Sequence, residues 1–167
     1  MTQVLDASAL LAFWLDEPGA EAVEAVVANG AAISTVSLSE VLARLVRDRP
    51  ALADQLVAAA QVAGAPAPSG GPPPGEGLSL PGMLAVEPFT LADAVGAAAL
   101  VPATRAAGLS FGDRACLALG RRLHGPVLTA DRNWARLDAR ATGVEIRMLR
   151  PRPARRGRDG PAPAPTP

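Results

Sequence analysis

Short apolar segments alternate with helical segments along this chain, and no other feature constrains its fold as strongly. Apolar runs typical of buried strands occupy residues 2–5, 31–34, 83–86, 127–129 and 144–148. Amphipathic or Ala-rich patterns typical of helices occupy residues 9–15, 20–28, 37–49, 50–61, 91–107 and 111–123, with a helical turn at 131–137. Strands that alternate with helices form a mainly parallel sheet flanked by helices. The sequence therefore predicts a single α/β domain over residues 1–149.

Two segments depart from this pattern. Residues 64–82 are dominated by Pro and Gly and have no periodicity, so we expect a flexible insertion between helices. Residues 150–167 combine Pro with five of the 16 basic residues, which predicts a disordered basic tail. Residues 1–149 keep 11 basic and 15 acidic residues, a net charge of −4. The tail can add salt-sensitive affinity for RNA, or it can serve only as a solubilising extension.

The composition excludes several kinds of chemistry. Every cationic side chain is Arg, so there is no Schiff-base lysine and no phosphate-binding P-loop. The single cysteine, Cys116, cannot form an internal disulfide, and we expect a packed thiol. Asp6 interrupts the first apolar run, and no run approaches about 18 apolar residues. We therefore expect a cytoplasmic protein with neither signal peptide nor membrane span.

Four acidic residues stand at the ends of predicted elements. Asp6 follows Val4–Leu5, and Asp131 follows the apolar run at 126–129. Glu40 lies in the helix after the second strand, and Asp113 lies in the first turn of the helix at 111–123. The carboxyl ends of parallel strands border the crevice where open α/β sheets place ligands. Oxygen ligands of this kind suit Mg²⁺, so these acids are candidates for a metal site.

Each acid could instead have a purely structural role, as a helix cap, a partner of the helix dipole or a member of an ion pair. Asp6 can cap the following helix, and Asp131 can cap a turn before Trp134. Asp113 can interact with the helix dipole. Glu40 can pair with Arg44 one turn later on the same helix. The residues alone leave these interpretations open.

Four segments carry a family resemblance: DASALLA at the N-terminus, SLSEVLAR around Glu40, LSFGDRACLALG and LTADRNW. In this order they resemble the PIN-domain family, and within it the VapC-type toxin ribonucleases. The resemblance spans residues 2–148, with the Pro/Gly-rich insertion unmatched. It implies a PIN-like α/β fold, a Mg²⁺-dependent endoribonuclease activity for which Mn²⁺ is an alternative ion, an RNA substrate, a small antitoxin partner and a homodimer.

The resemblance also assigns roles to the acids. It makes Asp6, Glu40, Asp113 and Asp131 catalytic, with Asp6 and Asp113 as direct metal ligands. Glu40 and Asp131 then act through bound waters or a second metal. Many family members carry a further acid two residues after the fourth, and here that position is Asn133.

Other residues near the acids are candidates for supporting roles. The hydroxyls of Ser8 and Thr129, and the amide of Asn133, can orient a carboxylate or a metal-bound water, although Ser and Thr in turns are often caps. Basic residues that can hold RNA phosphates, or be ordinary surface charge, are Arg114, Arg132 and Arg136. The two tryptophans, Trp14 and Trp134, are expected to pack in the core or in an interface. His124 is the only histidine, which argues against a ribonuclease that relies on a pair of imidazoles.

Three functions remain open at this level. The first is the toxin of a toxin–antitoxin pair. The second is a PIN-like nuclease that matures RNA without an antitoxin, and the third is a catalytically inactive binding module.

Overall fold

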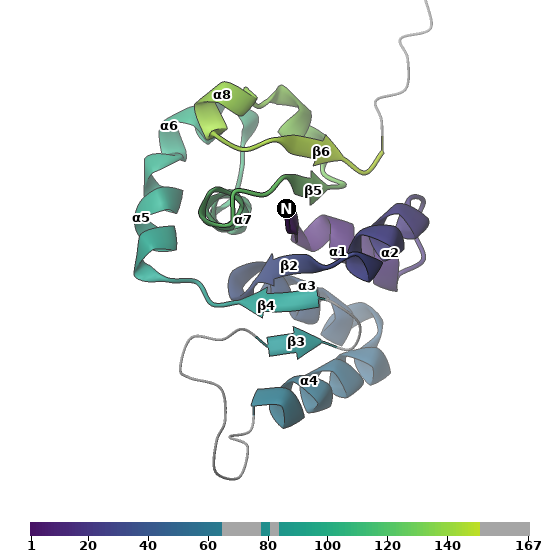
Figure 1. Ribbon diagram of the computed structural model, residues 1–167. Coiled ribbons are helices and arrows are strands. Elements are labelled where there is room, and N and C mark those ends of the chain that lie inside the picture. Colours follow the sequence, from purple (N-terminus) through teal and green to yellow (C-terminus); the bar gives the residue numbers. More distant parts are fainter. Residues whose placement is uncertain (65–77, 81–83, 151–167) are drawn as a thin grey trace, which may run out of the picture.

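A computed structural model describes residues 1–64, 78–80 and 84–150, which form an α/β domain around one sheet (Figure 1). Six strands pair in the order β3-β4-β2-β1-β5-β6. The five strands from β4 to β6 are parallel, and β3 is antiparallel to β4 at one edge. The strands are β1 (Gln3–Leu5), β2 (Ala31–Ser34), β3 (Leu78–Leu80), β4 (Leu84–Glu87), β5 (Val127–Thr129) and β6 (Ile146–Met148). The predicted mainly parallel sheet is confirmed.

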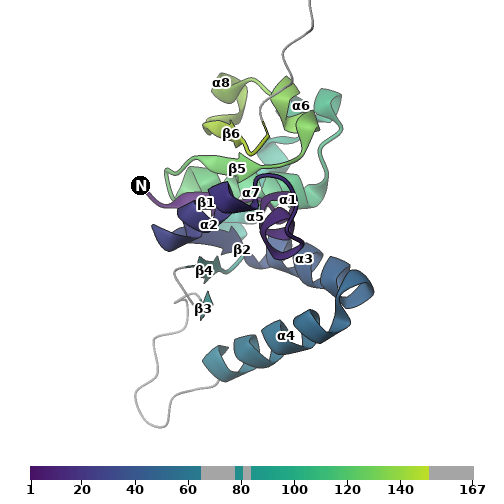
Figure 2. The same ribbon diagram turned by 90° about the vertical axis from the view of Figure 1, so that its right-hand side faces the viewer.

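Helices cover both faces of this sheet. They are α1 (Ala7–Trp14), α2 (Ala20–Ala28), α3 (Thr35–Asp48), α4 (Pro50–Gly64), α5 (Leu91–Ala99), α6 (Val101–Thr104), α7 (Phe111–Arg122) and α8 (Ala139–Thr142), with 3₁₀ turns η1 (Arg105–Ala107) and η2 (Arg132–Arg136). Figure 2 shows α4 extending from the end of α3 below the rest of the molecule.

The strands alternate their side chains between two apolar cores, as the pleat of a strand requires. Leu5 and Ile33 pack with α1 to α4 in one core. Val4 and Ala32 pack with α7 and η2 in the other. Trp134 lies in this second core, 1% exposed, as the sequence predicts. Because both faces are covered, the central strands β2 and β5 are buried along their whole length rather than alternating, which is typical of parallel sheets.

Several element boundaries differ from those expected. The helix expected from Ser37 begins at Thr35, because the Ser34 hydroxyl accepts hydrogen bonds from the backbone N–H groups of Val36 and Ser37, both at 3.1 Å. The segment 91–107, in which Pro102 is expected to disturb the later part of the helix, is divided into α5, α6 and η1, because Pro lacks the backbone N–H that a helix interior needs. The helix α8 was not expected.

The Pro/Gly-rich segment also needs a correction. It was expected to be a flexible insertion throughout 64–82, yet Leu78–Leu80 form β3, in register with β4 through Ser79 opposite Ala85. A strand here covers the edge that β4 would otherwise expose. Residues 65–77 and 81–83 and the predicted tail at 151–167 lie outside the described residues.

An ion-pair network that the sequence analysis did not identify joins α7 to α5 and β4. The Arg122 guanidinium donates to Asp93 and to Glu87, both at 3.1 Å, and to the carbonyl of Pro88 at 3.2 Å. Asp93 is only 3% exposed and also forms a capping box with Thr90 at the start of α5. Arg122 therefore compensates a buried charge and fixes one end of the helix whose other end carries Asp113.

Two further expectations concern the core and the membrane. Cys116 is fully buried, and its thiol donates to the carbonyl of Leu5 at 3.6 Å, which confirms the packed thiol. No helix in the described part of the chain is long and apolar enough to cross a membrane.

Replacing Arg122 with Ala should destabilise the protein, because it leaves the buried Asp93 carboxylate without its cation. The free energy of unfolding should fall by about 2 kcal/mol, which is less than for a fully buried ion pair because Arg122 is partly exposed. The corresponding fall in Tm is about 4–8 °C. Thermal denaturation followed by circular dichroism measures it. Arg105→Ala on η1 is the matched control, and equal Tm values for the two variants would contradict the role of the network.

Candidate functional site

Asp6 stands at the carboxyl end of β1, where its carboxylate caps α1. It is 3% exposed, and one oxygen, Oδ2, accepts hydrogen bonds from the hydroxyls of Ser8 at 2.6 Å and Thr129 at 2.9 Å. The Ser8 backbone N–H also donates to Oδ2, at 3.3 Å. No hydrogen bond within the described chain reaches Oδ1. Asp6 thus caps the helix and keeps one carboxylate oxygen available to a ligand.

The two hydroxyls are themselves held by the backbone that follows β5. Ser8 Oγ accepts from the N–H of Ala130 at 3.0 Å, and Thr129 Oγ1 accepts from the N–H of Asp131 at 3.1 Å. Each hydroxyl therefore uses its own proton for Asp6. The structure brings Ser8 and Thr129 together around Asp6, and an orienting role for both is consistent with this geometry.

Glu40 and Asp113 meet where α3 passes the first turn of α7. The carboxylate of Glu40 lies against Gly112, so closely that a Cβ at this position would collide with it. Asp113 forms a capping box with Ser110: its Oδ2 accepts from the Ser110 N–H at 2.6 Å, and its own N–H donates to the Ser110 hydroxyl at 3.2 Å. The absence of a side chain on Gly112 lets Glu40 approach. The sequence contained this glycine within a motif, but nothing local indicated its contact.

The alternative ion pair of Glu40 is not formed. Arg44 pairs with Asp48 on its own helix instead. Within the described residues, no arginine forms an ion pair with Asp6, Glu40 or Asp113. These three carboxylates therefore interact through their charges without a compensating cation from the described chain.

This arrangement changes the acidity of the site. Burial raises the pKa of Asp6, and the charge of Asp113 raises it further, while hydrogen bonds from Ser8 and Thr129 oppose the rise. The pKa of Glu40 is raised by burial and then by the charges of Asp6 and Asp113. Burial raises the pKa of the Cys116 thiol, and all three acids add to it. We define Asp6, Glu40 and Asp113 as the acidic cluster.

Asp131 is placed differently. Its Oδ1 accepts from the N–H of Asn133 at 2.9 Å and so caps η2. It is not among the charges that shift the pKa of Asp6 or Glu40. Its link to the acidic cluster runs through its backbone N–H to Thr129, and from Thr129 to Asp6. The side chain of Asn133 is exposed beside it.

The basic candidates also differ from one another. Arg114 is half-buried and donates to the carbonyl of Leu109 at 2.9 Å, so one of its N–H groups is already engaged. Arg132 and Arg136 on η2 are exposed. A role in binding RNA phosphates remains a prediction for all three.

The donor set of the cluster suits a hard divalent cation. Among the described residues, no three Asp, Glu, His or Cys side chains are arranged to hold one metal ion directly. Mg²⁺, however, is usually held by one or two carboxylates and keeps several waters. The free oxygen of Asp6 and the mutual repulsion of the three carboxylates fit such an ion, because a cation removes that repulsion.

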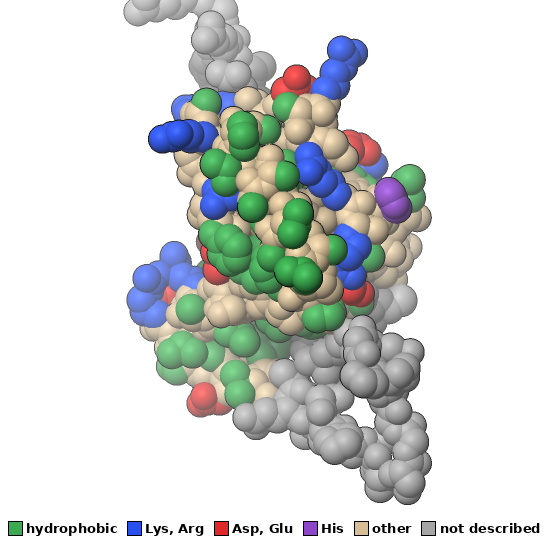
Figure 3. Space-filling view, turned by 90° about the vertical axis from the view of Figure 1, so that its left-hand side faces the viewer, with side chains coloured by type: hydrophobic (Ala, Val, Ile, Leu, Met, Phe, Trp, Pro, Cys, Tyr) green, Lys and Arg blue, Asp and Glu red, His purple; other side chains and the backbone are tan. Residues whose placement is uncertain are grey.

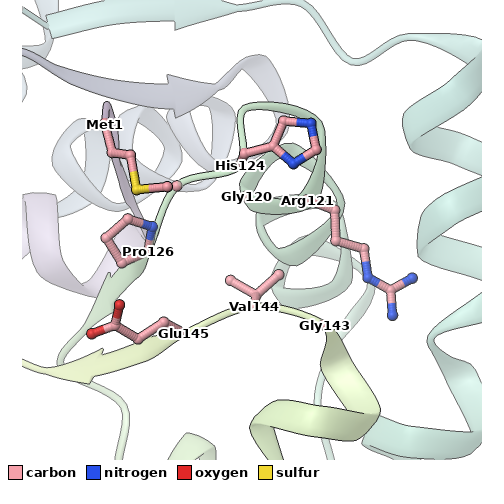
Figure 4. A pocket seen from close by; sticks show the side chains of 9 residues that line it. Met1, Gly120, Arg121, His124, Pro126, Gly143, Val144 and Glu145 are labelled. Atoms are coloured by element: carbon pink, nitrogen blue, oxygen red, sulfur yellow. The ribbon is translucent and has the colours of Figure 1, made fainter.

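Two hollows lie elsewhere, at the amino ends of the strands. The one in Figure 4 has a volume of about 270 Å³ and is bordered by the end of α7, by Pro126 and by the residues before β6. Its charged residues are engaged: Arg121 donates to the carbonyl of Thr142 at 2.6 Å, and Glu145 pairs with Arg147 at 2.8 Å. His124, the only histidine, lines this hollow. The second hollow lies between Met1, Asn29 and Ala85. Neither includes the acidic cluster.

Comparisons with known proteins agree with this fold. The family model of the PIN domain matches residues 4–67. None of the curated proteins matches the sequence significantly. Similar solved structures include a toxin–antitoxin complex from Klebsiella pneumoniae, with 14% identity and a TM-score of 0.58. VapBC2 from Rickettsia felis bound to a DNA fragment from its promoter has 12% identity and a TM-score of 0.57. FitAcB from Neisseria gonorrhoeae has 14% identity and a TM-score of 0.58. Each alignment covers 89% of this chain and 98% of the other.

The raised pKa of Glu40 makes a prediction about stability. The Glu40 carboxyl group binds its proton more tightly in the folded protein than in the unfolded chain, so ionised Glu40 destabilises the folded state. This destabilisation is absent below pH 4.5, the ordinary pKa, and complete above the folded-state pKa. Glu40→Gln should therefore raise Tm at pH 7.5 without divalent ions, and the gain should shrink as the pH falls toward 4.5. Solvent screens this partly exposed group, so we expect less than about 1 kcal/mol, or about 2–4 °C at most.

Thermal denaturation across this pH range, with a chelator present, measures the effect. Glu24→Gln on the exposed side of α2 provides the matched control. A Tm for Glu40→Gln at or below that of the wild type at pH 7.5 would show that the cluster does not destabilise the protein.

Proposed function

We propose that this chain, which folds as a PIN-like α/β domain, is a divalent-metal-dependent endoribonuclease and the toxin of a toxin–antitoxin pair. The observation that carries the proposal is the acidic cluster: three carboxylates at the carboxyl edge of a parallel sheet, with no cation from the described chain beside them. The matched PIN domain and the fold shared with chains of toxin–antitoxin complexes support it.

In this proposal Asp6 and Asp113 hold the ion, Mg²⁺ or Mn²⁺, while Glu40 and Asp131 contact its waters. A divalent ion bound by these residues would supply Lewis acidity to polarise the scissile phosphate and to lower the pKa of an attacking water. Ser8 and Thr129 donate to Oδ2 of Asp6, which leaves Oδ1 as the oxygen that would be available to such an ion. Asn133 keeps the Asp131 carboxylate in place through its backbone N–H. Arg114 and Arg132 bind RNA phosphates beside the cluster.

The antitoxin partner is proposed from the similar solved structures, among which is a toxin–antitoxin complex. Half-buried apolar side chains on α1, at its C-cap and on α2 offer it a surface, and they are Leu11, Trp14, Leu15, Val26 and Val27. A cytoplasmic location follows from this assignment.

We further propose a homodimer, formed by the exposed faces of α5, α6 and the start of α7. Leu91 is 83% exposed, Val95 64% and Phe111 53%. Figure 3, which faces this side, shows hydrophobic side chains gathered across it. In residues 91–102 the only ionisable side chain is Asp93, which is buried and paired with Arg122. The part of this face that residues 91–102 form therefore carries no exposed charge, and it can meet its own copy around a two-fold axis without like-charge repulsion.

Purified protein should cleave RNA into discrete fragments only when Mg²⁺ or Mn²⁺ is present. Asp6→Asn and Asp113→Asn should each reduce the rate by at least about 100-fold, because each removes a charge that holds the ion. Gel analysis of total RNA measures this, with Asp54→Asn on the exposed side of α4 as the control. Cleavage that survives both substitutions would place the activity outside the acidic cluster.

The double variant Leu91→Glu/Val95→Glu should be a monomer at concentrations where the wild type is a dimer, because it places like charges opposite each other. Size-exclusion chromatography with light scattering reports the mass. Val46→Glu, at an exposed apolar position on α3, is the control and should leave the dimer intact. A wild type that is monomeric, or a double variant that still dimerises, argues against this face.

A further inference from the structure

Two phenylalanine rings meet at the start of α7, directly before the glycine that Glu40 contacts. The ring centroids of Phe89 and Phe111 lie 5.5 Å apart and the ring planes meet at 81°, so the pair is edge-to-face. Such pairs attract each other beyond the apolar area that they bury. Phe111 is nevertheless 53% exposed, so a large part of its side chain is open to solvent. The pair thus presents an open aromatic surface at this end of α7.

The backbone around Phe89 is held by three elements. Its N–H donates to the hydroxyl of Thr35, the first residue of α3, at 3.1 Å. The carbonyl of Pro88 accepts from Arg122 of α7 at 3.2 Å, and the residue after Phe89 begins the capping box of α5. The segment that carries the supporting ring of Phe111 is therefore fixed by α3, α5 and α7.

The order of residues along α7 places this aromatic surface next to the acidic cluster. Phe111, Gly112 and Asp113 are consecutive, and successive residues of a helix point about 100° apart, so the direction of Gly112 falls between those of its neighbours. The carboxylate of Glu40 lies against Gly112. Phe111 and Asp113 therefore flank Glu40, and they are separated by only about 3 Å along the helix axis. A nucleotide next to a phosphate held at Asp113 is close to Phe111.

Phe111 lies at the border of the proposed dimer face and differs from the other exposed apolar residues there. Leu91 and Val95 belong to residues 91–102, in which the only ionisable side chain is buried. Phe111, by contrast, adjoins carboxylates of the acidic cluster. Covering it with a second copy would bring two acidic clusters together, and like charges repel. Leu91 and Val95 therefore suit the dimer better than Phe111 does.

We propose that Phe111, supported by Phe89, stacks on an unpaired nucleobase of the RNA whose phosphodiester enters the acidic cluster. The inference rests on the proposed function in one respect, the identity of the substrate as RNA. Every base has a π face, so an aromatic side chain can bind it whatever the sequence. A base within a double helix is already stacked, so this subsite selects a base that stands outside a helix. Stacking supplies affinity that does not depend on charge, at an edge where carboxylates repel a phosphate backbone.

The test compares two labelled oligomers of equal length that bind to the full chain. One is a single-stranded RNA of mixed sequence, and the other is the same ribose–phosphate backbone without bases. Fluorescence anisotropy with a chelator present measures both affinities while the RNA is not cut. The wild type should bind the RNA about tenfold more tightly than the abasic oligomer, because stacking of one base on an aromatic side chain has about this effect.

Two substitutions at Phe111 separate its ring from its apolar character. Phe111→Leu keeps an apolar side chain without a ring, and it should weaken RNA binding by at least about fivefold while the affinity for the abasic oligomer stays within about twofold. Phe111→Trp keeps an aromatic ring and should bind RNA as tightly as the wild type. Because neither substitution changes a charge, the salt dependence of RNA affinity should be unchanged.

Two further measurements accompany this comparison. Val46→Ala, which removes an exposed apolar side chain elsewhere on α3, is the matched control and should bind both oligomers as the wild type does. In cleavage assays with Mg²⁺ or Mn²⁺, Phe111→Leu should raise KM and leave kcat within about twofold, because it removes a contact with a base and none with the reacting atoms.

Equal affinity of the wild type for the two oligomers would overturn the proposal. An equal loss for both oligomers in Phe111→Leu would overturn it as well, because the loss would not depend on a base. A lower kcat at unchanged KM would mean that Phe111 positions Asp113 rather than a base. A monomeric Phe111→Leu protein in light scattering would assign the ring to the dimer instead. Absence of metal-dependent cleavage by the wild type would reject the proposed function and leave the binding comparison standing.

Discussion

The buried carboxylate of Asp6 is the group around which the carboxyl edge of the sheet is assembled. One of its oxygens joins β1, α1 and β5 through the hydroxyls of Ser8 and Thr129. Thr129 extends the network, because its hydroxyl accepts from Asp131 and its carbonyl accepts from Leu149. Hydrogen bonds to this oxygen lower the cost of burying the charge. The same network therefore fixes where β1 and β5 end.

The acidic cluster opposes folding, and the rest of the domain offsets it. Burial and the charges of neighbouring acids raise the pKa values of Asp6 and Glu40, so holding both carboxylates ionised at neutral pH opposes folding. Two apolar cores, one on each face of the sheet, supply the compensation. Asp113 has two opposite effects on stability, since it stabilises α7 as part of a capping box and its charge repels the other acids. Stability and binding of a cation are thus coupled through the same side chains.

Much of the fold could be predicted from the local pattern of apolar and polar residues in the sequence. Apolar runs located β1, β2 and β5, and a helical pattern located α2. The interpretation of Asp6 as a helix cap is confirmed, and its role as a site residue stays a prediction. Contacts over long sequence distances were not accessible in this way. Leu78–Leu80 have no strand signal apart from their pairing with β4. The network of Arg122, Asp93 and Glu87 joins residues up to 35 positions apart. Pairing and packing, rather than local propensity, decide such elements.

By itself the sequence determined which residue types stand at the ends of which elements, because capping and burial act over a few neighbouring residues. That was sufficient to select four acids and two hydroxyls. Only the tertiary structure decided how these groups face one another. The crossing of α3 and α7 at Gly112 brings Glu40 to the cluster, whereas Arg44 turns to Asp48 and Asp131 turns to its own 3₁₀ turn. The distances that govern charge interactions depend on how helices pack across the sheet, and no local pattern contains that information.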